Sequence, residues 1–167
     1  MTQPERGQVV VCQPDEGQSY WQPVPANGYS EVRVSHHNHP SITTFSSGIQ
    51  VIAPGCHIRE HQHPEHDELL FFFEGRGKAV IDGEEYPLRP GTTVYVGPMR
   101  RHKFVNTGDT DLKMCWVLMP GGANGLHDFF RDIGRPRTPG EPAPEPFPRP
   151  ANVEQIEANT VFRRLDT

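Results

Sequence analysis

The chain has 167 residues, a formal net charge of −5 and a hydrophobic fraction of 34%. This length suits one domain with additional arms and excludes two complete domains. The acidic balance excludes nucleic acid as a partner, because no stripe of Lys and Arg exists to displace the counterions of a phosphate backbone.

Residues 1–28 are expected to form an N-terminal arm with one short strand at 9–12. Residues 1–17 carry Pro, Glu, Gln and Asp where a secretory signal peptide needs an apolar stretch. Cys12, Cys56 and Cys115 are odd in number and form no C-x-x-C pair, so a cytoplasmic protein is expected. The apolar runs at 69–73 and 114–119 are too short to cross a bilayer, so no membrane contact is expected.

Residues 29–120 show short extended segments that are broken by turn residues. We expect strands at 29–34, 41–53, 57–61, 67–73, 78–81, 84–88, 93–96, 103–106 and 112–119. Asp82-Gly83 predicts a two-residue type I′ hairpin, because both residues tolerate a positive φ. Many short strands at a spacing of about ten residues favour a β-sandwich or a β-barrel.

The pattern changes after residue 120. Leu126, Phe129, Phe130 and Ile133 share one helical face, which predicts a short helix within 121–134 with Asn124 as N-cap and Gly134 as its stop. Residues 135–167 begin with a Pro-rich stretch, since seven prolines fall within 134–150. Such a stretch is expected to be an extended strap, followed by a last short helix that Asn152 caps.

The histidines at 61 and 63 form a His-x-His pair. On a strand, residues i and i+2 point to the same face, and Pro64 biases His63 toward the extended conformation. Such a pair alone is more often solvated or hydrogen-bonded than a metal ligand. Glu68 on the following strand and His102 after the Gly97-Pro98 turn are the candidates that would complete a metal site.

Two spaced blocks surround these residues. The first is Gly55-x5-His61-x-His63-x4-Glu68-x6-Gly75, and the second is Gly91-x6-Pro98-x3-His102-x3-Asn106. Together, over roughly 49–119, they resemble the paired motifs of the cupin superfamily. In the second block the proline is displaced by one position and Arg100 replaces the usual glycine, so we expect an altered turn before His102.

The resemblance implies an all-β fold, a double-stranded β-helix or jelly-roll cupin barrel, with the short helix and the Pro-rich arm after it. It also implies one divalent metal in the barrel mouth, held by His61, His63, Glu68 and His102. Iron is the first expectation, with Mn, Ni, Co or Zn as alternatives. An octahedral ion with four protein ligands would keep two positions open for a small-molecule substrate, dioxygen or water.

Strand alternation suggests which side chains surround the metal. His57 and Arg59 share the face of His61. Arg59 would anchor a substrate carboxylate or phenolate, or else lie on the surface. His57 and His66 would act as acid/base groups together with Glu68, or else support the ligands or face solvent. The expected pocket is partly aromatic, and its residues are Arg59, Leu70, Phe72, Phe104 and Phe129. Phe129 and Phe130 would line a lid or else pack on the barrel exterior.

Three functions remain open. The first is a mononuclear non-haem dioxygenase acting on an aromatic or diketone-like compound, as in the cupin dioxygenases that this pattern resembles. The second is an isomerase, decarboxylase or lyase that uses the metal as a Lewis acid, with His57, His66 or Tyr95 as base. The third is a non-catalytic small-molecule-binding module. Open barrel edges and extended arms also predict a homodimer.

Overall fold

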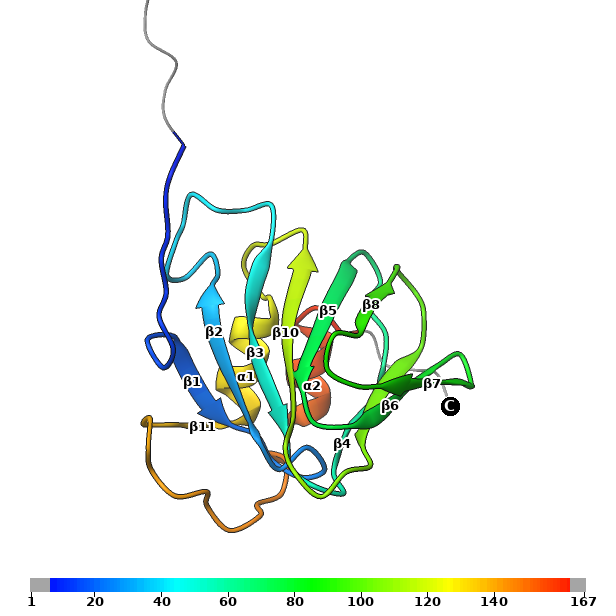
Figure 1. Ribbon diagram of the computed structural model, residues 1–167. Coiled ribbons are helices and arrows are strands. Elements are labelled where there is room, and N and C mark those ends of the chain that lie inside the picture. Colours follow the sequence, from blue (N-terminus) through cyan, green and yellow to red (C-terminus); the bar gives the residue numbers. More distant parts are fainter. Residues whose placement is uncertain (1–6, 163–167) are drawn as a thin grey trace, which may run out of the picture.

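The computed structural model describes residues 7–162, and it folds mainly as two antiparallel β-sheets that face each other (Figure 1). The larger sheet has the strand order β11-β1-β2-β3-β10-β5-β8. Its strands are β1 (Gln18–Trp21), β2 (Tyr29–Val34), β3 (Ser46–Ile52), β5 (Asp67–Glu74), β8 (Thr93–Val96), β10 (Leu112–Met119) and β11 (Arg135–Pro136). The smaller sheet has the order β4-β9-β6-β7, with β4 (His57–His61), β6 (Gly77–Ile81), β7 (Glu84–Leu88) and β9 (His102–Asn106).

The core lies between the inner faces of the two sheets. Along β10 every second side chain is buried, beginning with Leu112, and β5 buries Leu70 and Phe72 in the same way. The Phe72 ring of the larger sheet lies 5.6 Å from the Phe104 ring of the smaller sheet. This alternation is the reason why the chain forms a two-sheet jelly roll, and the expected fold class is confirmed.

Most of the expected strands are present, and the differences have local causes. The strand expected at 41–53 begins only at Ser46, because residues 40–45 form turns and a bend. No strand forms at 9–12, and β1 lies at Gln18–Trp21 instead. The Asp82-Gly83 turn is confirmed, since φ is 49° at Asp82 and 90° at Gly83 and β6 pairs with β7 around it.

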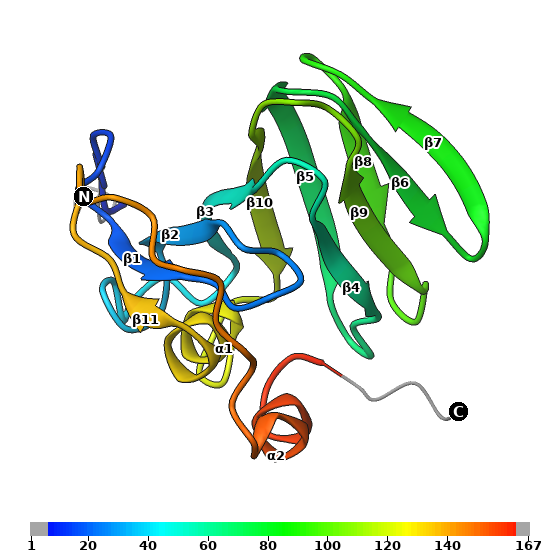
Figure 2. The same ribbon diagram turned by 90° about the horizontal axis from the view of Figure 1, so that it is seen from below.

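Two short helices follow the barrel, α1 (Leu126–Ile133) and α2 (Val153–Ala158), and they lie side by side in Figure 2. The helix α1 packs on the inner face of the larger sheet, where the Phe130 ring lies 5.8 Å from the Trp116 ring. Gly134 ends α1 as expected, but its N-cap is Gly125 rather than Asn124, which adopts a left-handed φ of 58°. Within residues 7–162, no helix is both long and apolar enough to cross a membrane.

The Pro-rich strap is more closely attached than its composition suggests. Its first residues form β11, which pairs with β1 and extends the larger sheet by one short strand. The Arg137 guanidinium lies 3.8 Å from the centre of the Tyr29 ring, and the buried Phe147 accepts a backbone hydrogen bond from Val24 through its carbonyl oxygen. The strap therefore carries α2 from the edge of the larger sheet to the mouth of the barrel.

Candidate metal centre

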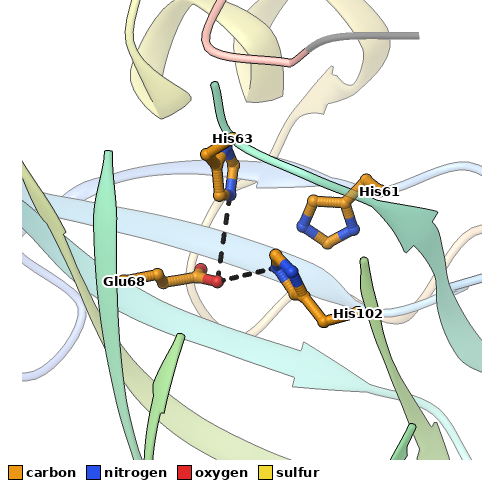
Figure 3. A group of neighbouring side chains, drawn as sticks. All are labelled: His61, His63, Glu68 and His102. Carbon is orange, nitrogen blue, oxygen red and sulfur yellow. Dashed lines mark ion pairs between the residues drawn. The ribbon is translucent and has the colours of Figure 1, made fainter. Parts of the chain in front are cut away.

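Four side chains from three strand regions converge at the barrel mouth (Figure 3). His61 is the last residue of β4, His63 follows it by two residues, Glu68 lies on β5, and His102 is the first residue of β9. One ligand atom from each of the four residues lies within 4.8 Å of the others. The structure thus brings together the four residues that the spaced blocks singled out.

The ligand atoms are buried and poorly satisfied by the protein itself. Within the described residues, His63 Nε2, Glu68 Oε2 and His102 Nε2 have no hydrogen-bond partner. His102 Nε2 lies 3.0 Å and His63 Nε2 lies 3.8 Å from Glu68 Oε2, so these atoms are close but not aligned for hydrogen bonds. Buried polar groups are normally paired, and three imidazoles with one carboxylate fit a divalent transition metal.

The second ring nitrogen of each histidine is held by the backbone. His61 Nδ1 lies 2.8 Å from the carbonyl oxygen of Arg59, and His102 Nδ1 lies 2.8 Å from that of Arg100. His63 Nδ1 lies 3.0 Å from the carbonyl oxygen of Val161, which is 98 residues away in the sequence. Because a carbonyl oxygen only accepts, each Nδ1 carries the proton, and each Nε2 keeps its lone pair for an ion.

The protonation of the cluster is set by burial and by the mutual contacts of its members. Burial holds the pKa of His61 well below its usual value, and His102 and His63 lower it further. Burial would raise the pKa of Glu68, but its contacts with His102 and His63 outweigh burial and lower it. Burial likewise opposes protonation of His102, yet the neighbouring Glu68 carboxylate raises the pKa of that ring. A cation therefore meets an ionised Glu68 and a neutral His61, and it competes with a proton at His102.

The sequence suggested that Arg100 alters the turn before His102, but the unusual backbone conformation lies at a different residue. The left-handed conformation, with φ of 63°, belongs to Met99 and not to Arg100. The Met99 backbone N–H donates to the His63 carbonyl oxygen at 2.8 Å, and Arg100 instead forms an ion pair with Asp82. The altered turn thus remains bonded to the backbone of the His-x-His segment and delivers His102 to the cluster.

A cavity of about 70 Å³ opens beside the cluster and is lined by His61 and Glu68. The barrel contributes Ile58, Leu70 and Phe104 to its wall. The segment after the barrel contributes the larger apolar share, namely Leu126, Phe129, Phe130, Ile133 and Phe162. Of these, Phe129 and Phe130 were expected as a lid or an exterior contact, and the helical spacing of Leu126 and Ile133 indicated packing without indicating against what. Phe162 was not expected at the cavity.

The other expected site residues are distributed as follows. His57, Arg59, Leu70, Phe104 and Phe129 line the cavity, and Phe129 therefore belongs to the interior rather than to the barrel exterior.

Two expectations are wrong. Phe72 is fully buried in the core and is not part of the cavity lining within the described chain. Tyr95 is 62% exposed and donates a hydrogen bond to Asp67, so it cannot serve as a base at the cluster. For His66 the structure fits the alternative of a group beside a ligand, because its ring lies 6.2 Å from the His63 ring and it is not part of the cavity lining among residues 7–162.

Sequence reasoning missed the charged part of the cavity wall. Arg149 of the strap and Glu157 of α2 line the cavity together with Arg59. No local signal marked either residue, because both lie in segments whose position depends on how the strap crosses the barrel.

Comparison with known proteins agrees with this geometry. Residues 48–118 match a family model described as a cupin domain. The chain is 37% identical over 78 residues to the polyketide synthase CurC of Streptomyces cyaneus, which covers 47% of this chain and 51% of that protein. It is 33% identical over 82 residues to quercetin 2,3-dioxygenase of Bacillus subtilis, which covers 49% of this chain and 23% of that protein. Further relatives include a second dioxygenase and an isomerase.

Among solved structures, a cupin 2 conserved barrel domain protein from Salinispora arenicola superposes with a TM-score of 0.53. The two sequences are 24% identical, and the superposition covers 68% of this chain and 90% of the Salinispora protein, so the likeness supports the fold. The chain spans about half the length of the curated relatives that it matches.

Proposed function

The chain belongs to the cupin superfamily through residues 48–118, and from this premise we propose that it is a metal-dependent enzyme, a mononuclear non-haem dioxygenase of small aromatic or diketone-like compounds. The observation that carries the proposal is the cluster of three histidines and one glutamate, which borders an apolar cavity. A structural zinc site usually has a closed shell rich in Cys, whereas this cluster contains no Cys and borders a cavity.

The relatives support the same class of chemistry. One of them is named a quercetin dioxygenase and another a polyketide synthase. Quercetin is an aromatic hydroxyketone whose neighbouring oxygens can bind a metal, and polyketides carry repeated ketone groups, so both names fit a small aromatic or diketone-like ligand. A partly aromatic cavity suits the flat apolar remainder of such molecules.

The residues of this chain would have three separate roles in such a reaction. His61, His63, Glu68 and His102 would hold the metal, which would supply Lewis acidity and, in the case of iron, redox exchange with dioxygen. Phe104 and Phe129 would exclude water and press against the substrate ring. His57 lines the same cavity, and its imidazole could accept a proton from a substrate hydroxyl group.

The position of His57 also favours a second candidate function. An imidazole in the wall, beside a metal that acts only as a Lewis acid, would suffice for an isomerase, decarboxylase or lyase. The isomerase among the relatives fits this candidate.

Oxygen uptake separates the two candidates. The protein is loaded with Fe(II) and offered a panel of flavonols, hydroxyaryl ketones and 1,3-diketones in an oxygen electrode. We expect one or more compounds to be consumed with equimolar uptake of dioxygen, and no turnover under argon. Full turnover under argon would overturn the dioxygenase proposal in favour of the second candidate.

Two variants accompany this assay. His63→Ala removes one of the four clustered groups and is expected to abolish turnover. His57→Gln keeps the cluster intact and is expected to lower turnover while leaving the metal content unchanged. Saturable binding of a panel compound by the loaded protein without any turnover, in air or under argon, would instead indicate a non-catalytic binding module.

A further inference from the structure

Two arginines meet a single carboxylate in the wall of the cavity. Arg59 comes from β4, Arg149 from the strap and Glu157 from α2. Arg149 Nη2 lies 2.6 Å from Glu157 Oε1, and Arg59 Nη2 contacts the same oxygen atom. All three residues line the cavity that also contains His61 and Glu68. Two parts of the chain that lie about 100 residues apart thus place one charged group beside the candidate metal centre.

This group has an excess of positive charge and of hydrogen-bond donors. Two guanidinium ions share one carboxylate, so the three side chains carry a net charge of +1. Each guanidinium has five N–H donors, yet Glu157 is its only side-chain acceptor within the described part of the chain. The Glu157 and Arg149 side chains are only 13% and 16% exposed, so bulk water compensates this excess only in part, whereas Arg59 is 44% exposed.

A carboxylate is the group that would match these donors. Guanidinium ions bind carboxylates through two parallel hydrogen bonds, and such bonds are strong because both partners are charged. Glu157 uses one oxygen for both arginines, which is a poorer arrangement than a two-oxygen contact.

We propose that Arg59 and Arg149 form a binding subsite for the carboxylate of an aromatic acid, and that Glu157 occupies this subsite while no ligand is bound. The aromatic ring would then lie against the apolar wall on the side of Phe129 and Phe104. This proposal rests on the proposed function in one respect, namely that the ligand would be the substrate or a close analogue of the substrate.

Ligand binding tests the subsite without any turnover. The full chain is loaded with Zn(II), and its affinities for benzoate and for the neutral analogue benzamide are measured by calorimetry. We expect benzoate to bind at least about tenfold more tightly than benzamide, which is the selectivity that one or two charge-assisted hydrogen bonds provide. Arg59→Gln and Arg149→Gln are each expected to remove most of this preference.

The variant Glu157→Gln gives the sharpest result. If Glu157 competes with the ligand, its neutral analogue should raise the affinity for benzoate several-fold and leave that for benzamide unchanged. Arg131→Gln is the matched control for Arg59→Gln. The Arg131 side chain is 46% exposed, close to the 44% of Arg59, but it is paired with Asp128 and Asp132 and does not line the cavity among the described residues. It should alter neither affinity.

Three outcomes would overturn the inference. One is equal binding of benzoate and benzamide by the unaltered protein. Another is a benzoate affinity that neither arginine variant changes, because the carboxylate then lies on the metal. The third is weaker benzoate binding by Glu157→Gln at unchanged zinc content and melting temperature, because Glu157 then only holds the arginines. A failed oxygen assay would overturn the dioxygenase proposal and leave the carboxylate preference standing.

Discussion

At the scale of single residues, each histidine of the cluster has one nitrogen held by a backbone carbonyl and one directed at its partners. His63→Ala removes the Nε2 atom as a metal ligand, so we expect the metal affinity to fall at least about a hundredfold. This loss exceeds the usual cost of removing a group that only supports a ligand. The measurement is the ratio of metal to protein after dialysis, by elemental analysis.

His66→Ala is the matched control for this variant. His66 lies in the same loop and its ring is 6.2 Å from that of His63, but it is outside the cluster. It is expected to keep a full complement of metal. Equal metal loss in both variants would mean that the loop, and not the Nε2 atom of His63, determines binding.

His127 should make the stability of the protein depend on pH. Its ring lies 2.9 Å from the Ser35 hydroxyl and 3.3 Å from the Tyr20 hydroxyl, and burial, reinforced by the neighbouring His37, lowers its pKa to about 4. An unfolded chain protonates the same ring near pH 6.5. Between pH 6.5 and 4 the unfolded state therefore binds more protons than the folded state, and stability falls as the pH falls.

Urea unfolding at pH 7 and pH 4.5 measures this effect. We expect the unaltered protein to lose on the order of 2 kcal/mol more than His127→Gln over this interval, because only the former must keep a buried ring neutral. Titrating groups that do not contact His127 act equally in both proteins and cancel in the comparison. Parallel losses in the two proteins would assign the acid sensitivity to those other groups.

At the scale of the elements, Asn106 joins three strand ends. Its side-chain amide donates to the carbonyl oxygens of Ile52 and Thr110, both at 2.8 Å, and its Oδ1 accepts from the Gly108 N–H at 3.0 Å. The side chain is buried, so Asn106→Ala leaves three backbone groups without their partner. We expect a loss of roughly 2–4 kcal/mol in the free energy of unfolding, against less than about 0.5 for the exposed neighbour Thr107→Ala. Chemical denaturation of both variants checks this difference.

The same elements mark how far the sequence could predict the fold and the site. Strand alternation placed His61 and His63 on one face, whereas the full set with Glu68 and His102 was predictable because the two spaced blocks resemble the cupin motifs. Arg149, Glu157 and Phe162 could not be predicted, since their positions depend on contacts between segments about 100 residues apart. Met99 shows a further limit, because nothing in a methionine signals a left-handed backbone.

At the scale of the whole molecule, the homodimer stays a prediction. The outer face of β5 carries Leu69, Phe71 and Phe73, where alternation would normally place polar side chains, and β8 is the edge strand beside it. We expect light scattering to give twice the chain mass of 18.8 kDa. Phe71→Lys should reduce the mass to that of one chain if a second copy covers this apolar face. A single-chain mass for the unaltered protein would contradict the dimer.

The hydrogen bond between His63 and Val161 has a consequence for the exchange of a bound ion. The four clustered residues lie within 61–102, on barrel strands or directly after one, whereas Val161 reaches His63 from 98 residues away. The Phe162 ring lies 5.1 Å from the rings of both His61 and His63, so we expect the docked segment to restrict the access of an ion to the cluster. The exchange of a bound ion should be governed by the lifetime of that docked segment, so metal release would be slow even where metal capture is fast.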